Sequence, residues 1–252
     1  MSEYQYFEFQ AIDRPLSKKD MAELRSYSTR AAITPTSFIN DYSWGNFKGD
    51  ADAWMAKYFD AFLYFANWGT HVLKLRLPEK LLNAKTARLY AVGEHAAVRA
   101  INGKVILSFH SENEDGDDML ESDGWLAALI SVRAELARGD LRALYLGWLL
   151  CAQNGEQDPG GLSPPVPAGL TKLSASLTNL VEFLRIDKAL VRASAKTVAK
   201  SWTVADLMRE LEAGSRMPQR VAADEAKGVM SHSRGAARRS ARSRRGRVIV
   251  GT

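Results

Sequence analysis

The spacing of the hydrophobic residues changes near the middle of this 252-residue chain. Between His71 and Leu77 leucines alternate with basic residues, which is the period of a strand with one buried face. From Trp125 to Leu136 apolar residues recur at helical spacing. Strand signals come first and helix signals later, and this order favours an α+β fold over an alternating α/β fold.

The first half of the chain predicts a mixed sheet with two helices and a hairpin. The hairpin signal is strong, because Asn102 and Gly103 both tolerate the positive φ of a tight turn. A capping box at Ser17–Asp20 predicts the start of one helix, and a broad apolar stripe predicts another over Gly49–Asn67. The expected strands are Tyr4–Ile12, Ala32–Trp44, His71–Leu77, Arg88–Val92 and the two arms of Ala97–Phe109.

The second half predicts helices only, and the chain divides into four expected parts. Residues 1–111 are an α+β domain, and residues 112–123 are an acidic loop with seven acids in twelve positions. Residues 124–214 are a helical region, interrupted by a connector at 158–169 that holds four of the eight prolines. Residues 215–252 are a disordered arginine-rich tail. The expected helices are Trp125–Leu136, Leu141–Leu149, Leu173–Leu184, Asp187–Ala195 and Thr203–Gly214.

The basic charge of the chain is concentrated in that tail. Residues 231–252 hold seven arginines and no acid, and without those seven charges the net charge of +5 becomes −2. Unopposed guanidinium groups attract phosphate and release counterions, which predicts nonspecific contact with nucleic acid, or with an anionic membrane surface. The alternative is an extension without a function. The arginines are Arg234, Arg238, Arg239, Arg242, Arg244, Arg245 and Arg247.

Motifs of several enzyme classes are missing from the sequence. It contains no phosphate-binding loop, no dinucleotide fingerprint and no nucleophile elbow. The four histidines are far apart, and the acidic loop places Ser111 and Ser122 where a calcium-binding EF-hand needs acids. The single Cys151 lies in an apolar stretch typical of a core. We therefore expect no cofactor and no metal site, and no catalytic residue is assigned.

Aromatic and charged residues at the predicted junctions form the candidate ligand or partner surface. The junction Tyr42–Gly49 combines aromatics with glycine and lysine, which is typical of a stacking platform beside a cation. His71 follows a junction between elements, where functional residues are common. The alternative interpretations are a turn that plugs the core and a buried structural histidine. The candidate residues are Asp13, Arg14, Arg30, Trp44, Phe47, Lys48, Trp68 and His71.

Five segments carry a resemblance that covers roughly residues 4–213. They are Tyr6–Leu16 (YFEFQAIDRPL), Ser28–Phe38 (STRAAITPTSF), Trp44–Gly49 (WGNFKG), Phe59–Thr70 (FDAFLYFANWGT) and Arg133–Trp148 (RAELARGDLRALYLGW). In these segments the chain resembles a family of uncharacterised bacterial proteins. The resemblance implies no activity, so no catalytic residue is taken from it. Longer proteins of similar sequence continue past Thr203–Asp206 with charged helix, and we interpret the tail found here as a truncated or frame-shifted end.

Three functional hypotheses follow. The first is a non-enzymatic binding or interaction protein with an unidentified protein partner, since the tested catalytic motifs are missing and aromatic junctions suit partner contact. The second is a hydrolase-like enzyme whose site assembles near Trp44, Trp68 and His71. The third is nonspecific nucleic-acid association through the tail alone. No secretory signal pattern and no transmembrane segment is recognisable, so we expect a cytoplasmic protein.

Overall fold

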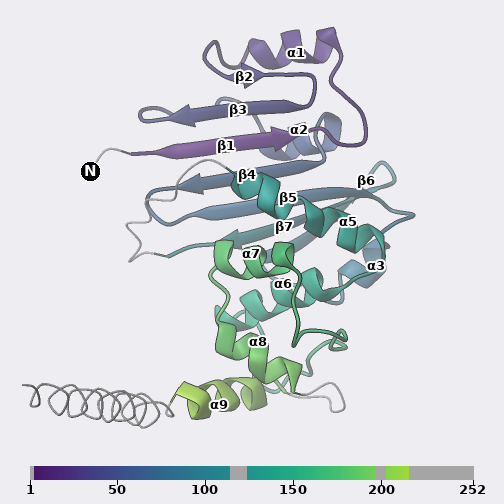
Figure 1. Ribbon diagram of the computed structural model, residues 1–252, viewed down its shortest axis with the longest axis vertical. Helices are drawn as coiled ribbons and strands as arrows, with labels where there is room; N and C mark the ends of the chain where they lie inside the picture. The colour runs from purple at the N-terminus through teal and green to yellow at the C-terminus, as the bar shows by residue number, and fades with distance from the viewer. Residues whose placement is uncertain (1–2, 114–123, 197–202, 216–252) are drawn as a thin grey trace, which may run out of the picture. The chain divides into compact units, whose positions relative to one another are not determined.

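The computed structural model describes residues 3–113, 124–196 and 203–215 (Figure 1). Most of the acidic loop and all seven tail arginines lie outside these ranges, so the predictions made for them are not tested. The described residues up to Met208 belong to one compact unit, and the described residues 209–215 are not part of it.

Seven strands form one sheet in the order β2-β3-β1-β4-β5-β7-β6. Every pairing among the described strands is antiparallel, so the expected mixed sheet is wrong in this respect. Antiparallel neighbours need only short connections, and such connections join β4 to β5 and β6 to β7. The strands are β1 Gln5–Gln10, β2 Ala32–Ile33, β3 Ser37–Tyr42, β4 Ala61–Ala66, β5 His71–Pro78, β6 Ala96–Ile101 and β7 Lys104–Ser111.

Helices lie on both faces of the sheet. Helices α4, α5 and α6 contact β4, β5 and β6, and α7 packs on them, so they cover what we name the helical face (Figure 1). On the opposite face, α2 contacts β4 and β5. The helices are α1 Lys18–Arg25, α2 Ala51–Lys57, α3 Ala84–Ala87, α4 Trp125–Leu129, α5 Ser131–Ala137, α6 Arg142–Gln153, α7 Ala175–Phe183, α8 Lys188–Ala195 and α9 Val204–Ser215.

Several local predictions are confirmed, together with the α+β class. Ser17 and Asp20 form both hydrogen bonds of the capping box at the start of α1. Asp187 caps α8 by accepting a hydrogen bond from the Ala189 amide. The β6–β7 hairpin turns at Asn102 (φ 49°) and Gly103 (φ 69°), as a type I′ turn requires.

The helix predicted over Gly49–Asn67 is wrong beyond Lys57. Helix α2 begins after its N-cap Asp50 but ends at Lys57, and Ala61–Ala66 is strand β4. This strand lies between β1 and β5 and is covered on both faces, so it is apolar at almost every position. A continuous apolar run shows no period of two, and its residues match helical spacing equally well.

Two predicted strands also differ from the structure. The segment Ala32–Trp44 is a hairpin of β2 and β3, and Pro35, which has no amide hydrogen, lies in its turn. The segment Arg88–Val92 is not a strand but follows helix α3, whose N-cap Asn83 accepts hydrogen bonds from two backbone amides. The short helix has no apolar period, and only its capping residue marks it in the sequence.

Aromatic rings fill the core between α2 and the sheet. Trp54 packs against Phe9 and Phe38, with ring centroids 5.2 and 4.9 Å apart. We name this side of the sheet the aromatic face; on β5 it carries Val72, Lys74 and Arg76, while the helical face carries His71, Leu73, Leu75 and Leu77. The rings of the cluster are Phe7, Phe9, Phe38, Tyr42, Phe47, Trp54, Tyr58, Phe59, Phe62 and Tyr64.

A buried ion pair joins Asp60 to Arg76 beneath α2. The Asp60 side chain is 1% exposed, and its Oδ1 accepts hydrogen bonds from Arg76 Nε and Nη2 at 3.1 and 2.8 Å. Arg76 Nη1 also donates to the carbonyl oxygens of Met55 and Ala56, both at 2.9 Å, at the end of α2. The pair therefore fixes where α2 ends on the sheet.

The same carboxylate also holds the segment after β1. Asp60 Oδ2 accepts hydrogen bonds from the amides of Ile12 and Asp13 at 2.7 and 2.8 Å. Arg133 of α5 donates to the Arg76 carbonyl and to Asp13 Oδ1, both at 2.7 Å. Burial by itself raises the pKa of Asp60, but the two amides and the Arg76 guanidinium outweigh it, and the pKa lies below its ordinary value.

We predict that Asp60→Asn destabilises the chain by about 3–5 kcal/mol, because it leaves the Arg76 guanidinium buried without a counter-ion. Urea unfolding of the full chain measures the loss. Glu182→Gln is the matched control, since Glu182 is 45% exposed and pairs with Lys188, which is 60% exposed. That change is expected to cost less than about 1 kcal/mol. Equal losses for the two variants would contradict the prediction.

The lowered pKa of Asp60 also predicts a pH dependence. A carboxyl whose pKa is lower in the folded state stabilises the fold fully above its unfolded value of about 3.9. This contribution is lost as the pH falls below that value and through the folded pKa. The free energy of unfolding, measured between neutral and acid pH, should fall more steeply for the natural chain than for Asp60→Asn. Parallel curves would rule this out.

Candidate functional site

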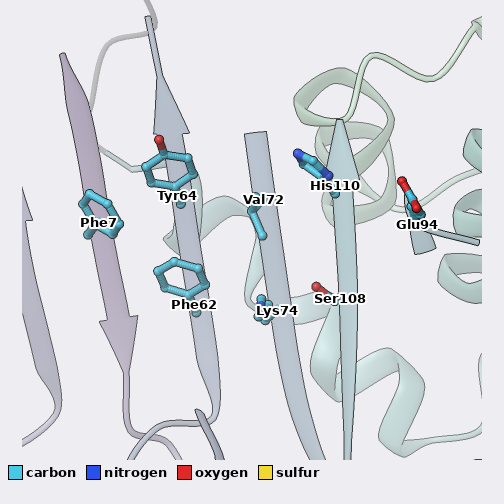
Figure 2. A pocket seen from close by; sticks show the side chains of 8 residues that line it. All are labelled: Phe7, Phe62, Tyr64, Val72, Lys74, Glu94, Ser108 and His110. Atoms are coloured by element: carbon cyan, nitrogen blue, oxygen red, sulfur yellow. The ribbon is translucent and has the colours of Figure 1, made fainter. Parts of the chain in front are cut away.

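An open hollow of about 300 Å³ lies on the aromatic face of the sheet (Figure 2). Strands β1, β4, β5 and β7 supply its floor, and a residue just before β6 stands at its far rim. Alternation along each strand brings these side chains to one face. The hollow is lined by Phe7, Phe62, Tyr64, Val72, Lys74, Glu94, Ser108 and His110.

One side of the hollow is aromatic. Phe7 of β1 lies opposite Tyr64 of β4, with ring centroids 4.6 Å apart, and it also stacks on Phe47 at 4.8 Å. The Tyr64 hydroxyl donates to Gln5 Oε1 at 3.2 Å, and Gln5 Nε2 donates to the Gly45 carbonyl at 3.1 Å. Burial raises the pKa of Tyr64 to about 12, so this wall carries a neutral phenol at physiological pH.

The other side of the hollow is polar. Lys74 of β5 lies opposite Ser108 of β7, and Val72 lies opposite His110. Lys74 forms an ion pair with Asp52 in the first turn of α2. Its side chain is only 14% exposed, so most of the lysine is removed from water.

A second polar cluster borders this wall. The ring of His110 stacks on the ring of His95, with centroids 5.9 Å apart, and His110 Nε2 lies 3.1 Å from Glu112 Oε1. His95 Nδ1 lies 2.7 Å from Glu156 Oε1, which also accepts a hydrogen bond from the His95 amide. Glu156 follows α6, so the cluster ties the edge of the sheet to the helical region.

A further hollow of about 700 Å³ lies between Tyr90 and the prolines of the 158–169 connector. Its polar groups are used within the fold. Arg142 pairs with Asp140 and donates to the carbonyls of Gly169 and Lys172, and the Tyr90 hydroxyl donates to the Pro165 carbonyl. We therefore take the hollow on the aromatic face as the candidate site.

His71 lies on the helical face, away from the candidate site. Its ring stacks on Phe183, and Nδ1 lies 2.6 Å from the Phe183 carbonyl oxygen. Arg185 Nη2 lies 2.9 Å from Nε2, so Nδ1 carries the hydrogen and Nε2 accepts. Both ring nitrogens are engaged, and this arrangement leaves neither for proton transfer to a substrate.

The structure does not gather the other predicted surface residues in one place. Asp13 pairs with Arg133 and Arg14 with Asp20, while Arg30 and Lys48 are exposed. Trp44 and Trp68 are exposed on separate turns, with 76% and 45% of their area accessible. None of the eight lines the hollow, but Phe47 stacks on Phe7, which does.

Sequence reasoning missed most of the residues that line the hollow. The alternation of 71–77 predicts only that Lys74 lies on the solvent side of a half-buried strand, and the helix predicted over Gly49–Asn67 includes Tyr64. The available signal was the alternation of β5, which puts Val72 and Lys74 on one face. Their neighbours across β4 and β7 depend on strand register, which the sequence alone does not give.

No family model, curated protein or solved structure matches this chain. The resemblance to a bacterial family therefore stays a prediction. Within the described ranges, no three or more His, Cys, Asp or Glu side chains are grouped so that they would hold a metal ion. None of the helices described there has the length and apolar composition needed to cross a bilayer.

Cys151 is predicted to be unreactive in the folded chain. Its thiol is buried, and burial together with the neighbouring Glu156 carboxylate raises its pKa to about 12. Because the thiolate is the reacting form, a chromogenic disulfide reagent at mildly alkaline pH should label it at least about a hundredfold more slowly than in the urea-unfolded chain. Equal rates in the two states would show that the thiol is accessible.

Proposed function

We propose that this protein is a non-enzymatic binding protein that holds a small ligand in the hollow on the aromatic face. The observation that carries the proposal is the division of its walls, with aromatic rings on one side and Lys74, Ser108 and His110 on the other. Ligand sites are typically concave and largely apolar, with a few converging polar groups. A hollow of about 300 Å³ is at the small end of such sites and suits a ligand of one or two rings.

The contacts around the hollow favour binding over catalysis. Nucleophilic catalysis needs a hydrogen bond between the nucleophile and its base. Among the described residues Ser108 makes no hydrogen bond to His110, and His71 is engaged on the other face. The hydrolase-like alternative has less support, since Trp44, Trp68 and His71 do not line this hollow.

The proposal includes a cytoplasmic setting in a bacterium. The single Cys151 is buried and unpaired, which suits a reducing compartment, and the bacterial source rests on the family resemblance. An unidentified protein partner and nucleic-acid contact through the tail arginines stay predictions, because no contact of the described residues bears on either.

Saturation-transfer NMR on the full chain tests the proposal, with phenol, indole, benzoate and benzylamine as probes. We expect at least one probe to bind the natural chain. Ser108→Phe should weaken that binding at least about tenfold, because the new ring fills the hollow. Arg99→Phe is the matched control, since Arg99 is exposed on the neighbouring edge strand β6.

Binding that is unchanged in Ser108→Phe, or the absence of binding by all four probes, would refute the proposed function. Both variants are first compared with the natural chain by urea unfolding, so that a loss of binding is not mistaken for a loss of fold.

A further inference from the structure

The polar wall of the hollow is rich in hydrogen-bond donors and poor in acceptors. The Lys74 ammonium has three hydrogens, and Asp52 is its acceptor among the described residues. The Ser108 hydroxyl, directly across the β5–β7 pair, has no partner among those residues. A ligand that excludes water from this wall must therefore bring an acceptor to the Lys74 ammonium, and the Ser108 hydroxyl can donate to the same acceptor.

The charge at this wall is also only partly neutralised. Asp52, the counter-ion of Lys74, is 52% exposed, while the Lys74 side chain is 14% exposed. Water screens the charge of an exposed carboxylate, so its attraction to the ammonium is weakened. The Lys74 ammonium therefore attracts a second oxyanion on its hollow side, and a neutral group at the same place gains less binding free energy.

The acidic groups of the rim lie away from Lys74. Figure 2 shows Glu94 on the far side of β7, while Lys74 projects from β5. Glu112 pairs with His110 Nε2 at 3.1 Å and is largely exposed. Because both carboxylates face solvent, their repulsion of an anion beside Lys74 is screened.

The aromatic wall adjoins the ammonium directly. Phe62 of β4 is the register partner of Lys74 on β5, and Tyr64 is the partner of Val72. Side chains paired across two strands are about 5 Å apart at Cβ. One small molecule can therefore place a ring against the aromatic wall and an acid group against the polar wall at the same time. The Tyr64 phenol donates to Gln5 and presents no negative charge to such a ligand.

We propose that the hollow selects small planar aromatic carboxylic acids, with the carboxylate on Lys74 and Ser108 and the ring against Phe62 and Tyr64. This inference rests on the proposed function, since it names the ligand class of the same hollow. An aromatic amine places a cation beside Lys74, and a neutral analogue leaves the ammonium without its second counter-ion.

Isothermal titration calorimetry on the full chain tests this selection, with benzoate, salicylate and cinnamate, each compared with its uncharged carboxamide. We expect at least one acid to bind about tenfold more tightly than its amide. Lys74→Met should abolish that preference, and Ser108→Ala, which removes only the hydroxyl, should reduce it. Lys104→Met is the matched control, because Lys104 is on the same face of β7 and pairs with Asp13 at 3.8 Å.

The outcomes separate this inference from the proposed function. If an acid and its amide bind equally, or if Lys104→Met changes the preference as much as Lys74→Met does, the acid selection is overturned. If no acid binds, the acid selection is overturned as well. In each case the proposed function would still be supported if phenol, indole or benzylamine binds the natural chain and Ser108→Phe abolishes that binding.

Discussion

The buried pair of Asp60 and Arg76 is the interaction on which the rest of the structure depends. A charged group buried in a protein needs a full set of partners, and here α2, the segment after β1 and α5 all contact the pair. Arg76 holds the last carbonyls of α2, Asp60 holds the amides that follow β1, and Arg133 of α5 reaches the Arg76 carbonyl from the helical side. The two faces of the sheet are therefore positioned by one set of charges.

The hollow follows from where that network places α2. The helix ends at Lys57 above the Arg76 guanidinium, and its Trp54 ring packs on Phe9 of β1 and Phe38 of β3. The other half of the aromatic face keeps Val72, Lys74, Ser108 and His110 only partly buried. The hollow thus lies at the border of the aromatic core cluster. On one side of it the sheet carries buried aromatic rings, and on the other side its side chains are only partly buried.

The sequence predicted the class of fold better than it predicted the site. Short sequence motifs are sufficient to predict structures formed by neighbouring residues, as in the Ser17 capping box and the Asn102–Gly103 turn. They failed for β4, because a strand buried on both faces has no alternation, and that error moved Phe62 and Tyr64 onto a predicted helix. Cross-strand neighbours such as Lys74 and Ser108 are fixed by register, which arises from tertiary packing.

The ion pairs of Arg133 with Asp13 and Asp60 have a consequence for synthesis of the chain on the ribosome. The carboxylates of Asp13 and Asp60 are synthesised early, whereas the Arg133 guanidinium that bridges their segments to α5 is added much later, after the acidic segment 112–123. Until that residue emerges, the nascent sheet has an uncovered leucine-rich face and an incomplete set of ion pairs. A cut at the boundary expected near residue 111 would remove Arg133 from its two carboxylate partners, and it would divide a segment that, up to Met208, is one compact unit.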